Sequence, residues 1–291
     1  MKNLKWTLLI LLVVTSVVFA QRRGGRFGGG RGYGGRGWGG ESWVSEDART
    51  AREVDSHSTG TPNWTNAPGF ERDVFTFVRI KRDYNPNGSG SSWRTDTPDS
   101  DLNLSYRLQQ MTAMKVDPNG RYLRLTEKQL SDYPFIYMVE PGSLYLADDE
   151  AEALRKYLLN GGFLWLDDFW GEYEWQNMAS QLEKTLPGRK WVELDLSHPL
   201  YHCVFNIREK YQVPSIHVFY SGRTSERYDS AEVHHRAIFD DKGRMMVLAT
   251  HNTDNGDGWE REGENREYFE QCSEKTAYPL AINVIFYIMT H

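Results

Sequence analysis

The sequence predicts a doubly wound α/β domain with a mostly parallel sheet and an added β-hairpin. Between residues 122 and 184, short apolar runs alternate with amphipathic segments in the order strand, helix, strand, helix. The runs Phe135–Val139 and Phe163–Leu166 are apolar on both faces, as central strands of a parallel sheet are. Near the C-terminus, Asp240–Gly243 separates two strand-like runs, which predicts the hairpin at a sheet edge.

The first part of the domain contains two further strands and a helix. Val74–Ile80 is rich in β-branched and aromatic residues, which predicts a strand. Asp99 or Ser100 can cap a helix whose apolar residues continue to Met111, and Tyr122–Leu125 is a short strand.

The clearest predicted helix follows Phe135–Val139. Its first turn is acidic at residues 148–150, where the helix dipole favours anions. One apolar stripe runs from Ala147 to Leu158, and Gly161 follows as the C-cap. After Phe163–Leu166, a second helix is expected over about residues 171–184.

The C-terminal part is predicted to hold three strands and a buried helix. The strand-like runs are Ile216–Tyr220, Val233–Phe239 and Met245–Thr250. The apolar helix expected from about Thr276 to Met289 is too short to cross a membrane.

The N-terminal residues predict export. Lys2 and Lys5 precede an apolar run that ends at Ala20, an arrangement typical of a cleaved signal peptide over residues 1–20, with an uncleaved anchor as the alternative. Residues 21–40 are Gly- and Arg-rich and are expected to be disordered, and residues 41–70 are expected to be a linker or a loose strap over the domain. The folded domain is expected over residues 71–291, in the periplasm or outside the cell.

Charge is distributed unevenly along the chain, which carries a net −6. Residues 1–20 hold two lysines and residues 21–40 five arginines, without any acid, so the remainder carries −13. Export and this acidic domain argue against nucleic acid as a partner. The basic segment is either a solvated spacer or a docking segment for anionic wall polymers or lipid head groups. Beyond the signal peptide, no membrane contact is expected.

Two cysteines and several missing motifs limit the chemistry. Cys203 and Cys272 either pair in an oxidising compartment or remain free thiols, and their spacing does not fit a zinc site. The sequence has no Walker loop, no G-x-G-x-x-G after a strand, no G-x-S-x-G elbow and no H-E-x-x-H. We therefore expect no cofactor, and no metal site is assigned.

The strongest candidate site follows the strand Phe163–Leu166. Asp167 and Asp168 would lie in the crevice beyond the carboxyl ends of the strands. Two neighbouring carboxylates can bind a metal or accept hydrogen bonds from sugar hydroxyls. One of them can also have a raised pKa and act in acid–base catalysis. Glu172 and His198 are the candidate catalytic partners. Alternatively, one aspartate caps the next helix and the other pairs with an arginine.

Candidate ligand-binding residues occur in two further loops and beside the aspartates. Residues 251–260 are dense in oxygen ligands, but the register of a calcium-binding EF-hand fails, and a tight Asx-type turn is the favoured alternative. Residues 93–96 could stack on a carbohydrate or contact a peptide, or they could form a rigid loop with a purely structural role. The candidates are Trp93, Asp96, Trp170, Asn252, Asp254, Asp257 and Trp259.

Six blocks of the chain, in order, resemble the bacterial domain of unknown function family 4159. They are FTFVRIKRDY, WRTDTPDSDLNL, YPFIYM, GGFLWLDDFWGE, SHPLYH and HNTDNGDGWE. The resemblance implies a class I glutamine amidotransferase-like, flavodoxin-type fold and a role in the bacterial envelope. It implies no established reaction.

A working amidotransferase of that fold places a cysteine on the sharp turn after a strand. The corresponding turn here is residues 166–170, which contain neither cysteine nor serine. Because an acyl-enzyme needs an activated nucleophile, we do not expect glutaminase activity. We expect a module that binds envelope proteins or wall glycans, with a carboxylate-dependent hydrolase of glycans or wall polymers as the alternative.

Overall fold

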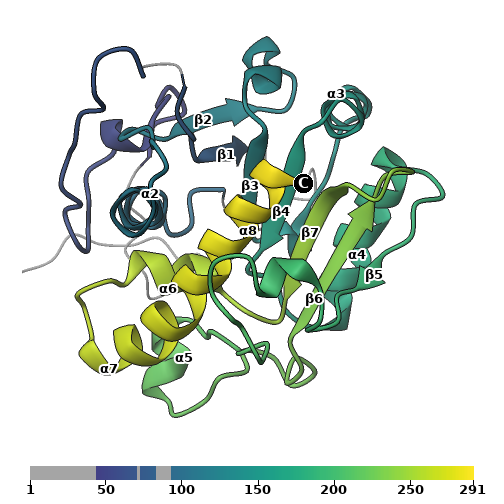
Figure 1. Ribbon diagram of the computed structural model, residues 1–291. Coiled ribbons are helices and arrows are strands. Elements are labelled where there is room, and N and C mark those ends of the chain that lie inside the picture. Colours follow the sequence, from purple (N-terminus) through teal and green to yellow (C-terminus); the bar gives the residue numbers. More distant parts are fainter. Residues whose placement is uncertain (1–43, 71–72, 83–92) are drawn as a thin grey trace, which may run out of the picture. The chain divides into compact units, whose positions relative to one another are not determined.

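The computed structural model describes residues 44–70, 73–82 and 93–291, so the predicted signal peptide and the Gly/Arg-rich segment lie outside the described residues. The fold is mixed α/β, with a seven-stranded sheet in the order β2-β1-β3-β4-β7-β6-β5 (Figure 1). The strands are β1 (Val78–Lys81), β2 (Arg121–Arg124), β3 (Phe135–Val139), β4 (Phe163–Asp167), β5 (Val192–Glu193), β6 (His234–Phe239) and β7 (Met245–His251).

Helices connect and cover these strands. The α-helices are α2 (Asp99–Met111), α3 (Asp148–Leu159), α4 (Gly171–Thr185), α5 (Ile216–Tyr220), α6 (Asn255–Glu260), α7 (Arg266–Tyr268) and α8 (Tyr278–Thr290). Short 3-10 turns are η1 (Ala51–Glu53), η2 (Lys128–Asp132), η3 (Pro141–Ser143) and η4 (Pro199–Tyr201), and η5 (Phe269–Ala277) is π-helical. Among the described residues, no helix combines the length and apolar character that a membrane crossing requires.

Five strands, from β2 to β7 in the sheet order, pair in parallel. β6 pairs antiparallel with β7, and the two-residue β5 pairs antiparallel with β6 at the edge. The pleat of the sheet sends neighbouring side chains to opposite faces. In β3, Tyr137 therefore belongs to one apolar cluster and Ile136 to the other.

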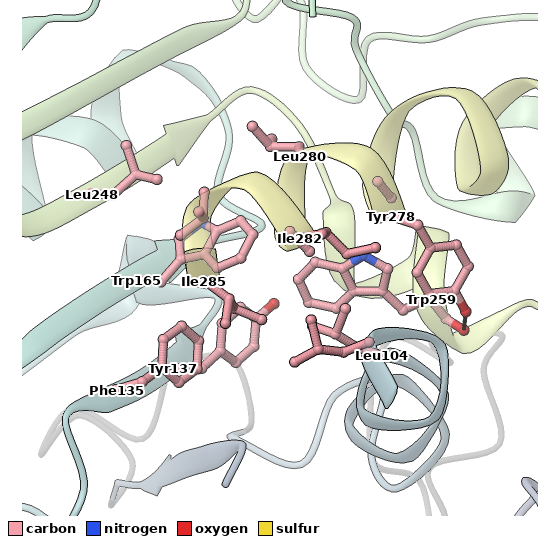
Figure 2. Packing of buried hydrophobic residues seen from close by; sticks show 14 of the residues in the cluster. Leu104, Phe135, Tyr137, Trp165, Leu248, Trp259, Tyr278, Leu280, Ile282 and Ile285 are labelled. Carbon is pink, nitrogen blue, oxygen red and sulfur yellow. Dashed lines mark hydrogen bonds between the residues drawn. The ribbon is translucent and has the colours of Figure 1, made fainter. Parts of the chain in front are cut away.

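Helices cover both faces of the sheet. On one face α8, yellow in Figure 1, and α2 pack on the aromatic residues of β3 and β4, whereas α3 and α4 cover the other face. Figure 2 shows Tyr137, Trp165 and Trp259 grouped against Ile282 and Ile285 of α8. The Trp165 and Trp259 ring centroids are 5.4 Å apart, so α6, the helix that follows β7, is anchored in the centre of this core.

The structure corrects one predicted element. Ile216–Tyr220, predicted as a strand, is the short helix α5. β-branched and aromatic residues favour strands because they fit a pleated surface beside a neighbouring strand. This run pairs with none of the strands in the described part of the chain, and its first amide, on Ile216, donates to the Asp257 carboxylate instead. The predicted strand over residues 74–80 is also shorter, because β1 begins at Val78.

Residues 44–70 pack on the same α/β unit. Val44 and Ala51 are buried in a small cluster with Trp93 and Tyr122. The Arg52 guanidinium donates to the carbonyls of Pro118, Thr61 and Pro62. These contacts fix the segment beside α2.

Candidate functional site

The candidate site lies at the carboxyl edge of the parallel strands. β4 ends at Asp167 and its parallel neighbour β7 ends at His251, so the residues that follow both strands meet at one edge of the sheet. The chain after β7 enters α6 within four residues. The turn after β4 and the start of α6 therefore face each other.

Asp167 is a fully buried acceptor that joins four segments of the site. It accepts hydrogen bonds from the Tyr137 hydroxyl (3.0 Å), the Thr250 hydroxyl, the Asn255 amide (2.8 Å) and the backbone amide of Gly256 (3.1 Å). Burial raises the pKa of Asp167 to about 6, although these donors oppose the shift. Its carboxylate positions the first turn of α6.

Asp168 occupies a sharp turn and faces other acids. Its backbone is left-handed, with φ 57°, and its carboxylate accepts a 2.8 Å hydrogen bond from the Trp170 indole. Burial, followed by the charges of Glu140 and Asp96, raises its pKa well above the ordinary value. Neither Asp167 nor Asp168 caps α4 or forms an ion pair with an arginine within the described chain, so the structural alternative considered for them does not hold.

Three aspartates from separate loops form what we call the acidic cluster: Asp96, Asp168 and Asp254. One carboxylate oxygen from each lies within 4.8 Å of the others, and all three residues are buried. Burial raises the pKa of Asp96 and Asp254 well above the ordinary value, and neighbouring acids add to the shift. The fold thus gathers three carboxyl groups where water is largely excluded.

Local backbone geometry brings the acidic cluster together. Asp96 has φ 63°, and Asp254 is the N-cap of α6, accepting a 2.7 Å bond from the Asp257 amide. Gly256 lies so close to Asp96 that a Cβ atom at residue 256 would overlap the Asp96 carboxylate. A side chain at residue 256 would therefore push the Asp96 carboxylate away from α6.

A second group of acids adjoins the acidic cluster and is already partly neutralised. Asp96, Asp257 and Glu260 also place oxygens within 4.8 Å of one another. The Arg261 guanidinium lies 3.0 Å from Asp257 and 2.8 Å from Glu260. Burial, with the charges of Asp96 and Asp257, raises the pKa of Glu260 to about 11. The His57 ring is 3.3 Å from the Glu260 carboxylate.

A buried ion pair holds the loop that carries Asp96. The fully buried Arg79 donates to both oxygens of Asp101 and to the carbonyls of Trp93 and Thr95. Its guanidinium also lies 5.2 Å from the Tyr137 ring centroid. Sequence reasoning did not identify Arg79 or Asp101. The available signal was an arginine inside an otherwise apolar strand, which requires a buried partner.

The three candidate tryptophans do not offer exposed ring faces. Trp93 is 2% exposed and packs edge-on against Tyr122, with the Arg94 guanidinium 4.9 Å from its ring centroid. Trp259 is fully buried, and Trp170 is 4% exposed. Trp170 still belongs to the site, because its indole donates to Asp168.

The remaining candidates lie around or away from the acidic cluster. Asn252 accepts from the Gly171 amide and donates to the Glu232 carbonyl, so it fixes the start of α4. Glu172 is exposed on α4. His198 caps η4 by accepting from the Leu200 amide, and its ring packs against Tyr287 on α8.

Both cysteines are free thiols. Burial raises the pKa of the Cys272 thiol to about 12, with the Asp257 charge adding to the shift. Burial also raises the pKa of Cys203. Neither is therefore an activated thiolate at neutral pH.

Comparison with known proteins gives one match. The family model described as "Domain of unknown function (DUF4159)" matches residues 76–289, which include every member of the acidic cluster. No curated protein matches the chain.

Proposed function

The chain belongs to the DUF4159 family, and on that premise we propose that it is an exported module that binds a ligand or partner in the cell envelope and performs no acyl transfer. The observation that carries this proposal is the turn after β4. It places Asp168, and no thiol or hydroxyl nucleophile, in the left-handed position.

A glutamine amidotransferase-like fold of the flavodoxin type is part of this proposal. Its support is the parallel order of β2, β1, β3, β4 and β7 and the sharp turn that follows β4. An amidotransferase of this type places its cysteine on such a turn. Here both cysteines lie elsewhere in the chain, and Cys272 is held as a neutral thiol by a pKa of about 12. An acyl-enzyme has no nucleophile at this position.

Exposed aromatic side chains beside the turn support binding of a wall glycan or an envelope protein. Tyr173 on α4 is 83% exposed and Tyr228 is 99% exposed. Their two segments are held together, because the Glu172 amide donates to Asp229 and Arg227 pairs with Glu174 at 3.0 Å. Exposed tyrosine rings next to acids suit stacking on sugar rings.

The test uses the purified full chain in two assays. Ammonia release from glutamine should be absent. Binding to insoluble wall glycans should fall about tenfold in Tyr173→Ser/Tyr228→Ser. Tyr145→Ser, at a tyrosine 46% exposed outside both segments, is the matched control. Glutaminase activity would refute the proposal, as would glycan and envelope-protein binding that the double variant leaves unchanged.

The hydrolase alternative has less support from the geometry. A glycan hydrolase needs two carboxyl groups facing each other across an open cleft, about 5 to 9 Å apart. Asp167 is committed to four protein donors, and His198 packs against α8. No observation favours these residues as an acid–base pair.

A further inference from the structure

The acidic cluster and the acids beside it differ in their ion pairs. Among the described residues, no Lys, Arg or His forms an ion pair with Asp96, Asp168 or Asp254. The neighbouring Asp257 and Glu260 do have such a partner, Arg261. Buried carboxylates without a partner either stay protonated or bind a cation.

Asp96 supplies a separate observation that points to a ligand. It is 9% exposed, and its Oδ2 atom is buried with no hydrogen-bond partner in the described structure. This oxygen lies against Gly256 at the entry of α6. Buried polar atoms are almost always satisfied, so an orphaned carboxylate oxygen among other carboxylates indicates a missing positive partner.

Each of the other two aspartates also retains an oxygen for a ligand. The Trp170 indole donates to Oδ1 of Asp168, and the Asp257 amide donates to Oδ1 of Asp254. These bonds leave the second oxygen of each carboxylate available. The protein donors thus orient both side chains and leave one oxygen of each carboxylate to coordinate a cation.

The number and type of the ligands select the class of cation. Three protein carboxylates each offer one oxygen to a common point. Calcium takes six to eight oxygen ligands, many of them carboxylates, whereas magnesium usually keeps several waters and binds only one or two carboxylates. The donor set contains oxygen only, with no sulfur or imidazole nitrogen of the kind that zinc prefers.

We propose that Asp96, Asp168 and Asp254 bind a hard divalent cation, with Ca²⁺ as the best fit. The sequence alone assigned no metal to this chain, because the three ligands come from loops that are far apart in the sequence and match no motif. The cation site goes beyond the proposed envelope function and does not depend on which glycan or protein the chain binds.

The test is a cation titration of the full chain after chelator treatment. Calorimetry with Ca²⁺, Mg²⁺ and Zn²⁺ measures affinity. Tb³⁺ provides an optical probe, because the Trp170 indole bonded to Asp168 is placed to sensitise its luminescence. We expect Ca²⁺ to bind more tightly than Mg²⁺ or Zn²⁺. Asp168→Asn and Asp254→Asn should each weaken Ca²⁺ binding more than about tenfold.

Two controls separate loss of the site from loss of the fold. Asp241→Asn changes an exposed aspartate that pairs with Arg189 and should leave Ca²⁺ affinity unchanged. In the metal-free state, Asp168→Asn should melt at the same temperature as the parent or higher, because the amide removes charge repulsion. Only the parent should gain thermal stability on addition of Ca²⁺.

Three results would overturn the assignment. The first is no heat and no sensitised luminescence with any of these ions. The second is undiminished binding by both asparagine variants. The third is loss of binding in Glu260→Gln with retention in Asp254→Asn, which would place an ion at the second group of acids. None of these results bears on the glycan-binding and glutaminase assays.

Discussion

Asp167 and Asp168 are adjacent in the sequence and have different roles in the structure. The Asp167 carboxylate is used by four donors from β3, β7 and α6. The Asp168 carboxylate has one donor and faces Asp96 and Asp254. The backbone explains the difference, because β4 ends at Asp167 and the left-handed turn at Asp168 directs the second side chain elsewhere. Asp167 organises the site, and Asp168 is available to a ligand.

Asp167→Ala should lower the free energy of unfolding by about 3 kcal/mol, because it leaves buried donors without an acceptor. Urea denaturation measures the effect. Asp55→Ala, at an exposed aspartate outside the helices and strands, is the matched control and should behave like the parent. If both variants unfold at the same urea concentration, Asp167 does not anchor α6.

His235 provides a pH test at the residue scale. Burial, with a contribution from Lys210, lowers its pKa to about 3. Between about pH 3 and 6.5 the unfolded chain therefore binds a proton at this residue that the folded chain does not. The free energy of unfolding should fall as pH drops through this window, by up to about 1.4 kcal/mol per pH unit from this residue.

In His235→Gln the free energy of unfolding should fall less steeply as the pH drops, because about one fewer proton is taken up on unfolding. The glutamine amide can still bond the Tyr201 hydroxyl. The exposed His217→Gln is the control and should keep the slope of the parent. Denaturation curves at several pH values between 4 and 7 give the slopes. Equal slopes for the parent and His235→Gln would mean that His235 is protonated in the folded protein.

The sequence identified most members of the site but not their grouping. Asp96, Asp168 and Asp254 were each candidates, in three separate loops. Their convergence depends on the parallel pairing of β3, β4 and β7 and on the left-handed backbone at Asp96 and Asp168. Neither is encoded in a local pattern, so one sequence could not predict a shared site.

Among the helices and strands, the sequence predicted the bounds well wherever the apolar residues form a clear pattern. β3 has the predicted bounds, Phe135–Val139, because every position is apolar. α3 begins at Asp148, where the acidic first turn predicted it. The prediction for Ile216–Tyr220 failed because a run of five mostly apolar residues does not distinguish a strand from a single helical turn without knowledge of the neighbouring strand. For the Arg79–Asp101 pair between β1 and α2, the sequence signalled a buried arginine but could not identify its partner, because the packing of α2 on β1 is not a local property.

That pair supports an element-scale prediction. Arg79→Met should lower the free energy of unfolding by about 3–5 kcal/mol, because it leaves the buried Asp101 carboxylate unpaired. Adding Asp101→Asn should restore part of the loss, since the amide carries no charge. Chemical denaturation of the single and double variants measures both effects.

The surface pair Lys156–Glu152 on α3 is the matched control. Lys156→Met should leave stability nearly unchanged, since exposed ion pairs contribute little. If Arg79→Met were as stable as Lys156→Met, the loop that carries Asp96 would be held by other contacts.

At the scale of the whole molecule, an acidic α/β domain follows a basic, Gly-rich segment and a hydrophobic N-terminus. The family match begins at residue 76, so it covers the domain and not these preceding segments. Export therefore stays a prediction from the sequence. If it is correct, the acidic cluster would face a compartment in which Ca²⁺ is available.

Expression of the full chain in a bacterial host with a periplasm tests the export prediction. Cleavage after Ala20 should give a mature chain that begins at Gln21. Intact-mass measurement of the periplasmic and cytoplasmic fractions distinguishes the two species. An unprocessed chain confined to the cytoplasm would contradict export.

Anomalous diffraction from crystals grown with Tb³⁺ or Ca²⁺ would locate a cation at the carboxyl edge of the sheet. We expect one peak about 2.3–2.6 Å from oxygens of Asp96, Asp168 and Asp254. Well-ordered carboxylates with no peak between them, or a peak only at surface acids, would contradict this expectation.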